Sequence, residues 1–169
     1  TQGMFVTLIM GTAFVQIGTW IGGYIGAQFI IFGNIARLLT GAGIGVGVAA
    51  MFGADSLVTV SAAITGMLGA FHGLGSAALG NSGEPLGAFI AAYIAIEIGM
   101  LISQKTSFSL ILTPFASILS GALVGYFATP YITRFIYWIV GLASYNVAAS
   151  PIIGGIVVAG VFSPFFFFF

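Results

Sequence analysis

The stretch MFVTLIMGTAFVQIGTWIGGYIGAQFIIF, from Met4 to Phe32, runs for nearly 30 residues without a formally charged side chain. A transmembrane helix needs about 20 consecutive, mostly apolar residues. The stretch is therefore longer than one upright span. It predicts either one long tilted helix or a span followed by a second piece that begins near Gly22 and Gly23, and Arg37 ends it.

The composition extends this membrane character to the whole chain. Of the 169 residues, 60% are hydrophobic and only 4% carry a formal charge, and the mean hydropathy is +1.21. A soluble domain carries about 25% charged residues. The sequence therefore predicts an all-α, polytopic integral membrane helix bundle that forms one membrane domain over residues 1–169.

The few charged residues exclude several classes of function. The chain has three basic and three acidic side chains, one histidine and no cysteine. No basic patch can form from so few cations, so nucleic acid is not an expected partner. Cysteine chemistry is excluded, and a single histidine argues against a zinc site. Because no nucleophile–base pair and no set of metal ligands stands out, we predict no catalytic residue, no metal site and no cofactor.

Polar and glycine-rich breaks separate further apolar segments after the first stretch. Two of these segments, residues 38–52 and 57–71, are near the lower length limit for a span, so one of the two is a candidate for a re-entrant helix. The expected apolar segments are residues 38–52, 57–71, 88–102 and 108–127, an interfacial or tilted helix at 128–146, and a last piece from Pro151. The sequence thus predicts five to seven membrane segments, with at least one re-entrant or broken helix.

Small residues recur at every fourth position in nearly every segment. They line one face of a helix and let two backbones approach closely, which drives helix association in lipid. These stripes are Gly18–Gly22–Gly26, Gly41–Gly45, Gly43–Gly47, Ala62–Gly66–Ala70, Ala91–Ala95–Gly99 and Ser117–Gly121–Gly125. They predict a compact bundle or a homo-oligomer.

A few polar side chains interrupt the apolar segments. Gln16 and Gln28 are expected to hydrogen-bond across helices. In the break FGADSL, Asp55 or the serine after it is expected to cap the following helix. Glu97 lies within an apolar segment, and Tyr93 is four residues earlier on the same helix face, within reach of a hydrogen bond. Glu97 is then either half of a buried structural pair or a site for substrate or protons.

The polar break HGLGSAALGNSGEPLGAF, His72–Phe89, allows two interpretations. In the first it is a surface loop, with the next helix capped at Ser82 or Gly83 and Glu84 near the positive end of that helix. In the second it lies at membrane depth and lines a cavity, as substrate sites of transporters do. A sugar would need the many donors and acceptors found here. The candidate substrate-binding residues are His72, Ser76, Asn81, Ser82 and Glu84, together with Glu97 in the next segment.

Three stretches carry a resemblance to a known family. They are IARLLTGAGIGVGVAAMFGADSLVTVSAAITGMLGA (35–70), GNSGEPLGAFIAAYIAIEIGMLISQKTSFSLILTP (80–114) and SYNVAASPIIGGIVVAGVFSP (144–164). They resemble the EIIC-type membrane family of phosphotransferase-system permeases, which includes the PfoR-like regulators. Members of the family are longer, so the resemblance implies that this chain is a truncated part of a longer transporter, about half of one. The run Phe165–Phe169 departs from the family pattern.

The resemblance implies a permease subunit that binds and translocates a sugar or a related small polar solute. Separate cytoplasmic proteins of the EIIA and EIIB type would carry out any phosphotransfer, so the chain itself is not expected to be an enzyme. Its expected location is the bacterial inner (plasma) membrane, where the lipid bilayer surrounds it. Two alternatives remain: a transporter or channel unrelated to phosphotransfer, and a membrane-bound regulator or sensor.

Overall fold

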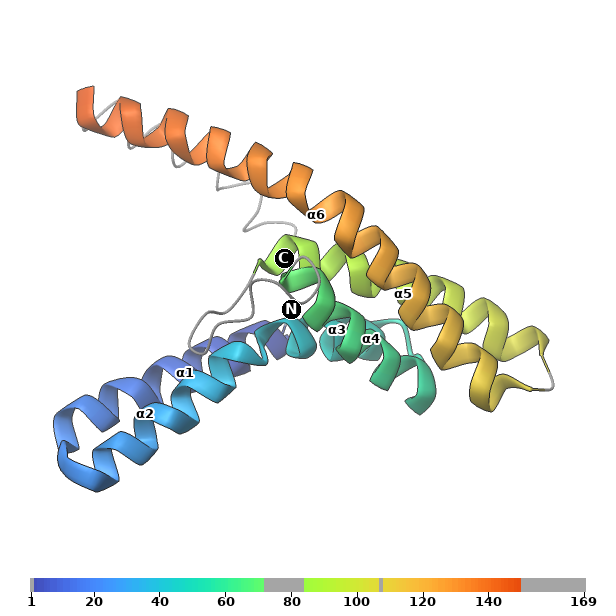
Figure 1. Ribbon diagram of the computed structural model, residues 1–169, viewed down its shortest axis with the longest axis horizontal. Helices are drawn as coiled ribbons and strands as arrows, with labels where there is room; N and C mark the ends of the chain where they lie inside the picture. The colour runs from blue at the N-terminus through green and yellow to red at the C-terminus, as the bar shows by residue number, and fades with distance from the viewer. Residues whose placement is uncertain (1, 72–83, 107, 150–169) are drawn as a thin grey trace. The chain divides into compact units, whose positions relative to one another are not determined.

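The computed structural model describes residues 2–71, 84–106 and 108–149, and these residues form helices and short connections without any strand (Figure 1). The helices are α1 (Gln2–Ile21), α2 (Gly23–Leu38), α3 (Thr40–Met51), α4 (Ser56–Ala70), α5 (Pro85–Lys105) and α6 (Ser109–Ala149). The predicted all-α bundle is confirmed.

The long uncharged stretch at the start of the chain forms two helices, as the second alternative predicted. The chain reverses at Gly22 and Gly23, whose φ angles are +64° and +61°. Glycine adopts this left-handed conformation at little cost, whereas a side chain would be strained there. As a result α1 and α2 run side by side as an antiparallel hairpin (Figure 1).

A bend at Leu39 joins α2 to α3 and supplies the predicted broken helix. The axes of α2 and α3 differ by 49°. The sequence predicted that Arg37 ends the first stretch. In the structure α2 continues one residue past Arg37, to Leu38. The main-chain carbonyl of Arg37 accepts a hydrogen bond of 2.7 Å from the Thr40 hydroxyl, which links the two helices across the bend.

Small residues bring α3, α4 and α5 close together. Gly41 of α3 lies against Gly66 of α4, and Gly69 of α4 lies against Gly87 of α5. A Cβ atom added at Gly69 would be 2.5 Å from the Gly87 carbonyl oxygen, so the two backbones are in direct contact. The predicted small-residue stripes of α3, α4 and α5 therefore do line helix contacts. The core around them is apolar and includes Ile44, Val48, Val58, Phe71 and Ile96. The stripe Gly18–Gly22–Gly26 does not lie on one helix, because Gly22 is in the turn between α1 and α2.

The last described helix, α6, is longer than expected. Pro114 and Pro130 lie inside it without ending it, and it includes the expected separate helix at 128–146. The chain divides into two compact units after Pro130, so the α6 residues up to Pro130 belong to the first unit and the rest to the second.

Three of the described helices are long and apolar enough to cross a membrane, namely α1, α5 and the part of α6 from Ser109 to Ile132. The bent pair α2–α3 would make a fourth span if it crosses as one unit. At 15 residues, α4 is shorter than a typical span. The short helices are thus α3 and α4, in the two segments that the sequence marked as candidates for re-entrant helices.

Candidate functional site

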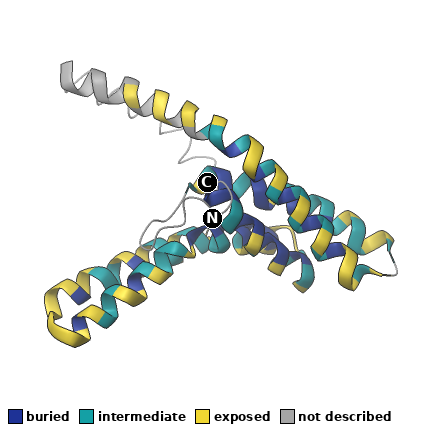
Figure 2. Ribbon diagram, viewed as in Figure 1, coloured by how far each residue is buried: buried dark blue, intermediate teal, exposed yellow. Residues whose placement is uncertain are grey.

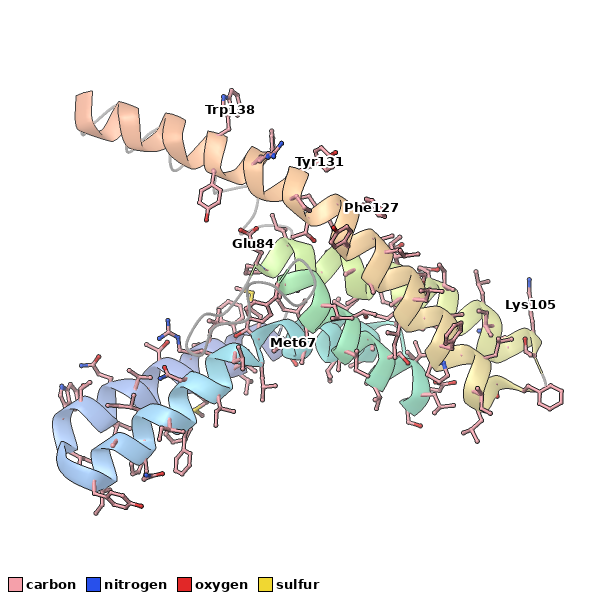
Figure 3. All side chains as sticks on the ribbon, in the orientation of Figure 1. Met67, Glu84, Lys105, Phe127, Tyr131 and Trp138 are labelled. Atoms are coloured by element: carbon pink, nitrogen blue, oxygen red, sulfur yellow. The ribbon has the colours of Figure 1, made fainter. Side chains whose placement is uncertain are left out.

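Of the six predicted substrate-binding residues, the structure describes two. His72, Ser76, Asn81 and Ser82 lie outside the described residues. Glu84 and Glu97 both belong to the region of α5, and Figure 3 shows Glu84 at the start of this helix and Lys105 at its other end.

Glu84 is the N-cap residue of α5, with an extended backbone (φ −99°, ψ 112°), and Pro85 follows at the first helical position. The predicted cap at Ser82 or Gly83 is therefore wrong by one or two residues. Proline suits this position because its fixed φ is helical and the first N–H of a helix has no partner within it. The expectation that Glu84 lies near the positive end of the helix is confirmed.

The two ends of the polar break are held together. The backbone N–H of Glu84 donates a 2.8 Å hydrogen bond to the carbonyl of Ala70, the last residue of α4. From α6, the Thr129 hydroxyl donates a 3.3 Å bond to the Gly69 carbonyl and also lies against Gly87. Ala70 and Glu84, the described residues near the two sides of the break, therefore lie next to each other.

Glu97 lies in a different environment. It is the thirteenth of the 21 residues of α5 and is partly exposed. Within the described residues its carboxylate has no hydrogen-bond or ion-pair partner, so the predicted bond to Tyr93 is absent. A carboxylate near the middle of an apolar spanning helix is costly unless it faces a polar partner, a cavity or a ligand.

An aromatic cluster surrounds Tyr93 next to Glu97. The Tyr93 ring makes an edge-to-face contact with Phe52, at 5.6 Å between centroids, and a stacked contact with Phe89, at 6.3 Å. Tyr93 and Phe52 remain 37% and 44% exposed. Phe89, Tyr93 and Glu97 recur every fourth residue and so share one face of α5. The spacing was visible in the sequence, but the contribution of Phe52 from the end of α3 was not.

The two described candidate carboxylates, Glu84 and Glu97, are well separated. Glu97 follows Glu84 by thirteen residues, which corresponds to about 20 Å along a helix. One sugar ring cannot contact both at once. The structure therefore divides the predicted site into a part at the start of α5 and a part around Glu97.

Asp55 has a structural role that the sequence anticipated. Its carboxylate caps α4 by accepting a 2.9 Å hydrogen bond from the backbone N–H of Val58. The Ser103 hydroxyl, near the end of α5, donates a second bond of 2.6 Å to the same carboxylate. The bond from Ser103, followed by the one from Val58, lowers the pKa of Asp55, because both stabilise the charged form.

Arg37 is a polar residue that sequence reasoning treated only as a boundary. Its aliphatic stem lies against Gly11 of α1, where an added Cβ would be 2.5 Å from the Arg37 Cγ. The Nε atom is fully enclosed and has no hydrogen-bond partner among the described residues. No pattern in the sequence indicates this unmet donor, because it arises from the packing of α2 on α1.

Comparison with known families identifies the chain. The model of the family "Phosphotransferase system, EIIC" matches residues 1–166. The chain belongs to this family. No match is found among curated proteins or among solved structures.

Family membership confirms the resemblance seen in the sequence and makes this EIIC chain a membrane-embedded permease subunit of the phosphotransferase system. This role fits a chain that is not itself an enzyme. The narrower PfoR-like grouping stays a prediction.

Proposed function

We propose that this EIIC chain binds a sugar at the face of α5 that carries Phe89, Tyr93 and Glu97, and that it moves the sugar across the membrane. The observation that supports the proposal is the Glu97 carboxylate, which has no partner among the described residues and lies beside partly exposed aromatic rings.

The chemistry of this face suits a sugar. A carboxylate accepts strong hydrogen bonds from hydroxyl groups. Aromatic rings offer flat apolar surfaces on which the C–H face of a sugar ring can rest, and ligand sites typically combine such surfaces with a few polar groups. A bound sugar would also satisfy Glu97 at a depth where water is scarce.

The polar break before α5 is proposed as a second contact point for the same solute. Glu84 is bonded to the end of α4 and follows directly on this break, which carries His72, Ser76, Asn81 and Ser82 in the sequence. Because Glu84 and Glu97 are about 20 Å apart along α5, a sugar would meet them one after the other. Two separate contact points fit a translocation path better than a single closed pocket.

We also infer the setting of this activity. The family implies a cytoplasmic EIIB-type partner that phosphorylates the sugar, and an EIIA-type protein that supplies the phosphoryl group to it. We assign this chain the translocating role, and its single histidine lies between α4 and α5 in the sequence. We expect it to act as a homo-oligomer in the bacterial inner membrane.

The direct test is sugar binding by the purified chain in detergent. A thermal-shift screen against neutral sugars, sugar acids and inorganic ions identifies the solute class, and titration of Glu97→Gln then measures the role of the charge. Loss of a charged hydrogen bond costs about 1.5–3 kcal/mol, so we expect the affinity to fall about tenfold or more.

Gln104→Ala is the matched control, because Gln104 lies on α5 near its end and is exposed. The sugar affinity of the Gln104→Ala variant should equal that of the unmodified chain. Unchanged sugar binding by Glu97→Gln would remove Glu97 from the site. Sugar binding without counterflow of labelled sugar in vesicles would instead support a sensor.

A further inference from the structure

The tip of the α1–α2 hairpin exposes two aromatic side chains of the kind found at membrane surfaces. Trp20 and Tyr24 flank the Gly22–Gly23 turn and are 79% and 81% exposed (Figure 2). Tryptophan and tyrosine concentrate at the headgroup level of membranes, because each joins an apolar ring to a polar N–H or O–H group.

The glutamines near the tip support the same assignment. Gln16 and Gln28 lie five residues before Ile21 and five after Gly23, at matching heights on the two helices. Neither amide has a hydrogen-bond partner among the described residues, so the predicted bonds across helices are absent. An amide without a partner is costly in hydrocarbon. Five residues of helix correspond to about 8 Å, which keeps both amides within reach of the headgroup layer.

The body of the hairpin has the opposite character. Thr7 and Thr12 of α1 donate their hydroxyl groups to carbonyls of their own helix, at 3.0 Å and 2.7 Å, so they need no outside partner. Between the tip and the opposite end of the hairpin, which carries Gln2, Asn34 and Arg37, the exposed side chains are otherwise large and apolar. They include Phe5, Val6, Ile9, Met10, Ile31 and Phe32. Amides without a partner thus lie near the tip, and an apolar surface separates the tip from the polar opposite end of the hairpin.

We propose that the tip formed by Gln16, Trp20, Tyr24 and Gln28 binds the lipid headgroup layer and fixes the depth of the hairpin. The partner is the phospholipid surface: the amides and the Trp and Tyr polar atoms contact headgroups and water, and the rings rest at the acyl boundary. No charge lies between Thr1 and Ala36, so the contact does not depend on anionic lipid.

Tryptophan fluorescence tests the depth. The chain has two tryptophans, so Trp138→Phe leaves Trp20 as the single emitter. The variant is reconstituted into phosphatidylcholine vesicles with bromine atoms placed either high or low on the acyl chains. We expect the shallow label to quench Trp20 at least about twofold more strongly than the deep label. Replacing part of the lipid by anionic phosphatidylglycerol should leave this ratio unchanged.

A second probe keeps the test independent of one side chain. Trp20→Phe with Trp138→Phe and Tyr24→Trp moves the emitter to the other side of the turn, and the same quenching order is expected. Stronger quenching by the deep label would overturn the proposal and place the tip in the bilayer core. No quenching by either label would also overturn the proposal. Quenching of the tryptophan by acrylamide would then show a tip in water, and no quenching by acrylamide would show a tip covered by protein or by a second copy.

Discussion

The α1–α2 hairpin and the α4–α5–α6 bundle pack their helices by the same close approach of small residues. Among the described residues of these two regions, hydrogen bonds between helices are found in the bundle and not in the hairpin. In the hairpin, Gly18 faces Gly26 and Gly11 faces Gly33. In the bundle, the buried Ser117 hydroxyl of α6 donates a 2.7 Å bond to the Ala95 carbonyl of α5, and Thr129 bonds α4. The hairpin therefore depends on van der Waals contact alone, whereas hydrogen bonds also fix the register of the bundle.

This difference has a functional meaning. Helices held by van der Waals contacts of glycine backbones and apolar side chains can adjust by small shifts, because such contacts are not directional. Glu97 lies on α5 and Glu84 is its N-cap residue, and α5 is the helix whose position the hydrogen bonds specify. A binding residue needs such a fixed position, while a hairpin that sets membrane depth does not.

The largest effect is expected from Gly69→Ala in the bundle. The added Cβ would be 2.5 Å from the Gly87 carbonyl oxygen and 2.6 Å from the Ala91 Cβ. Because α5 and α6 both contact this place, the helices cannot separate without losing the Thr129 bond. We expect a loss of about 2–3 kcal/mol of unfolding free energy, measured by titration with SDS in mixed micelles.

The hairpin counterpart, Gly26→Ala, meets only the Gly18 carbonyl oxygen at 2.5 Å, and its next contacts are at 3.5 Å or more. Two helices without a fixed register can move apart slightly to fit the added Cβ, so the expected loss of unfolding free energy is about 1 kcal/mol. Gly141→Ala is the control, because nothing lies within 4 Å of its added Cβ. Equal losses at Gly69 and Gly26 would contradict the comparison.

A smaller effect is expected when a bond between helices is removed without changing the packing. Ser117→Ala deletes the bond to Ala95 and should cost about 0.5–1.5 kcal/mol in the same titration. Ser120→Ala is the matched control, since the Ser120 hydroxyl bonds to the Ser117 carbonyl of its own helix. If both variants lose the same unfolding free energy, the bond between Ser117 and Ala95 stabilises the bundle no more than a bond within one helix does.

The sequence alone predicted the fold more completely than the candidate site. Hydropathy and the glycine spacing predicted most of the helices and packing faces, because both depend on local properties. The Gly22–Gly23 pair marked a possible break in the first stretch, but the sequence left a single long helix open and did not predict the hairpin. The continuity of α6 was missed, since a proline inside a helix argues locally for a break. Neighbouring helices can compensate for the lost bond in a way that the sequence does not show.

The candidate site was predicted less completely for a related reason. Glu97 and Tyr93 were correctly placed on one helix face, but the expected bond between them was wrong. The Tyr93 ring contacts Phe52 instead, which is 41 residues away in the chain and comes close only when α3 packs on α5. Contacts of this kind, like the enclosed Nε of Arg37, are products of tertiary packing.

The smallest expected effect concerns Asp55, whose bond to Ser103 ties the α3–α4 connection to the end of α5. Hydrogen bonds from Ser103 and Val58 lower the pKa of Asp55 below its usual 3.8, so the native state binds this proton less readily than the unfolded state. The carboxylate therefore stabilises the fold fully above about pH 4. The contribution is lost as the pH falls through the lowered value.

Asp55→Asn should keep the helix cap, since asparagine caps as well as aspartate, but should remove this acid-dependent contribution. Melting temperatures recorded from pH 6 down to pH 3 would then fall less steeply for the variant than for the unmodified chain. Ser103→Ala removes the main cause of the lowered pKa and should shift the acid transition to higher pH. If Ser103→Ala leaves the transition in place, Ser103 does not hold Asp55 in solution, and the end of α5 is tied to the α3–α4 connection by packing alone.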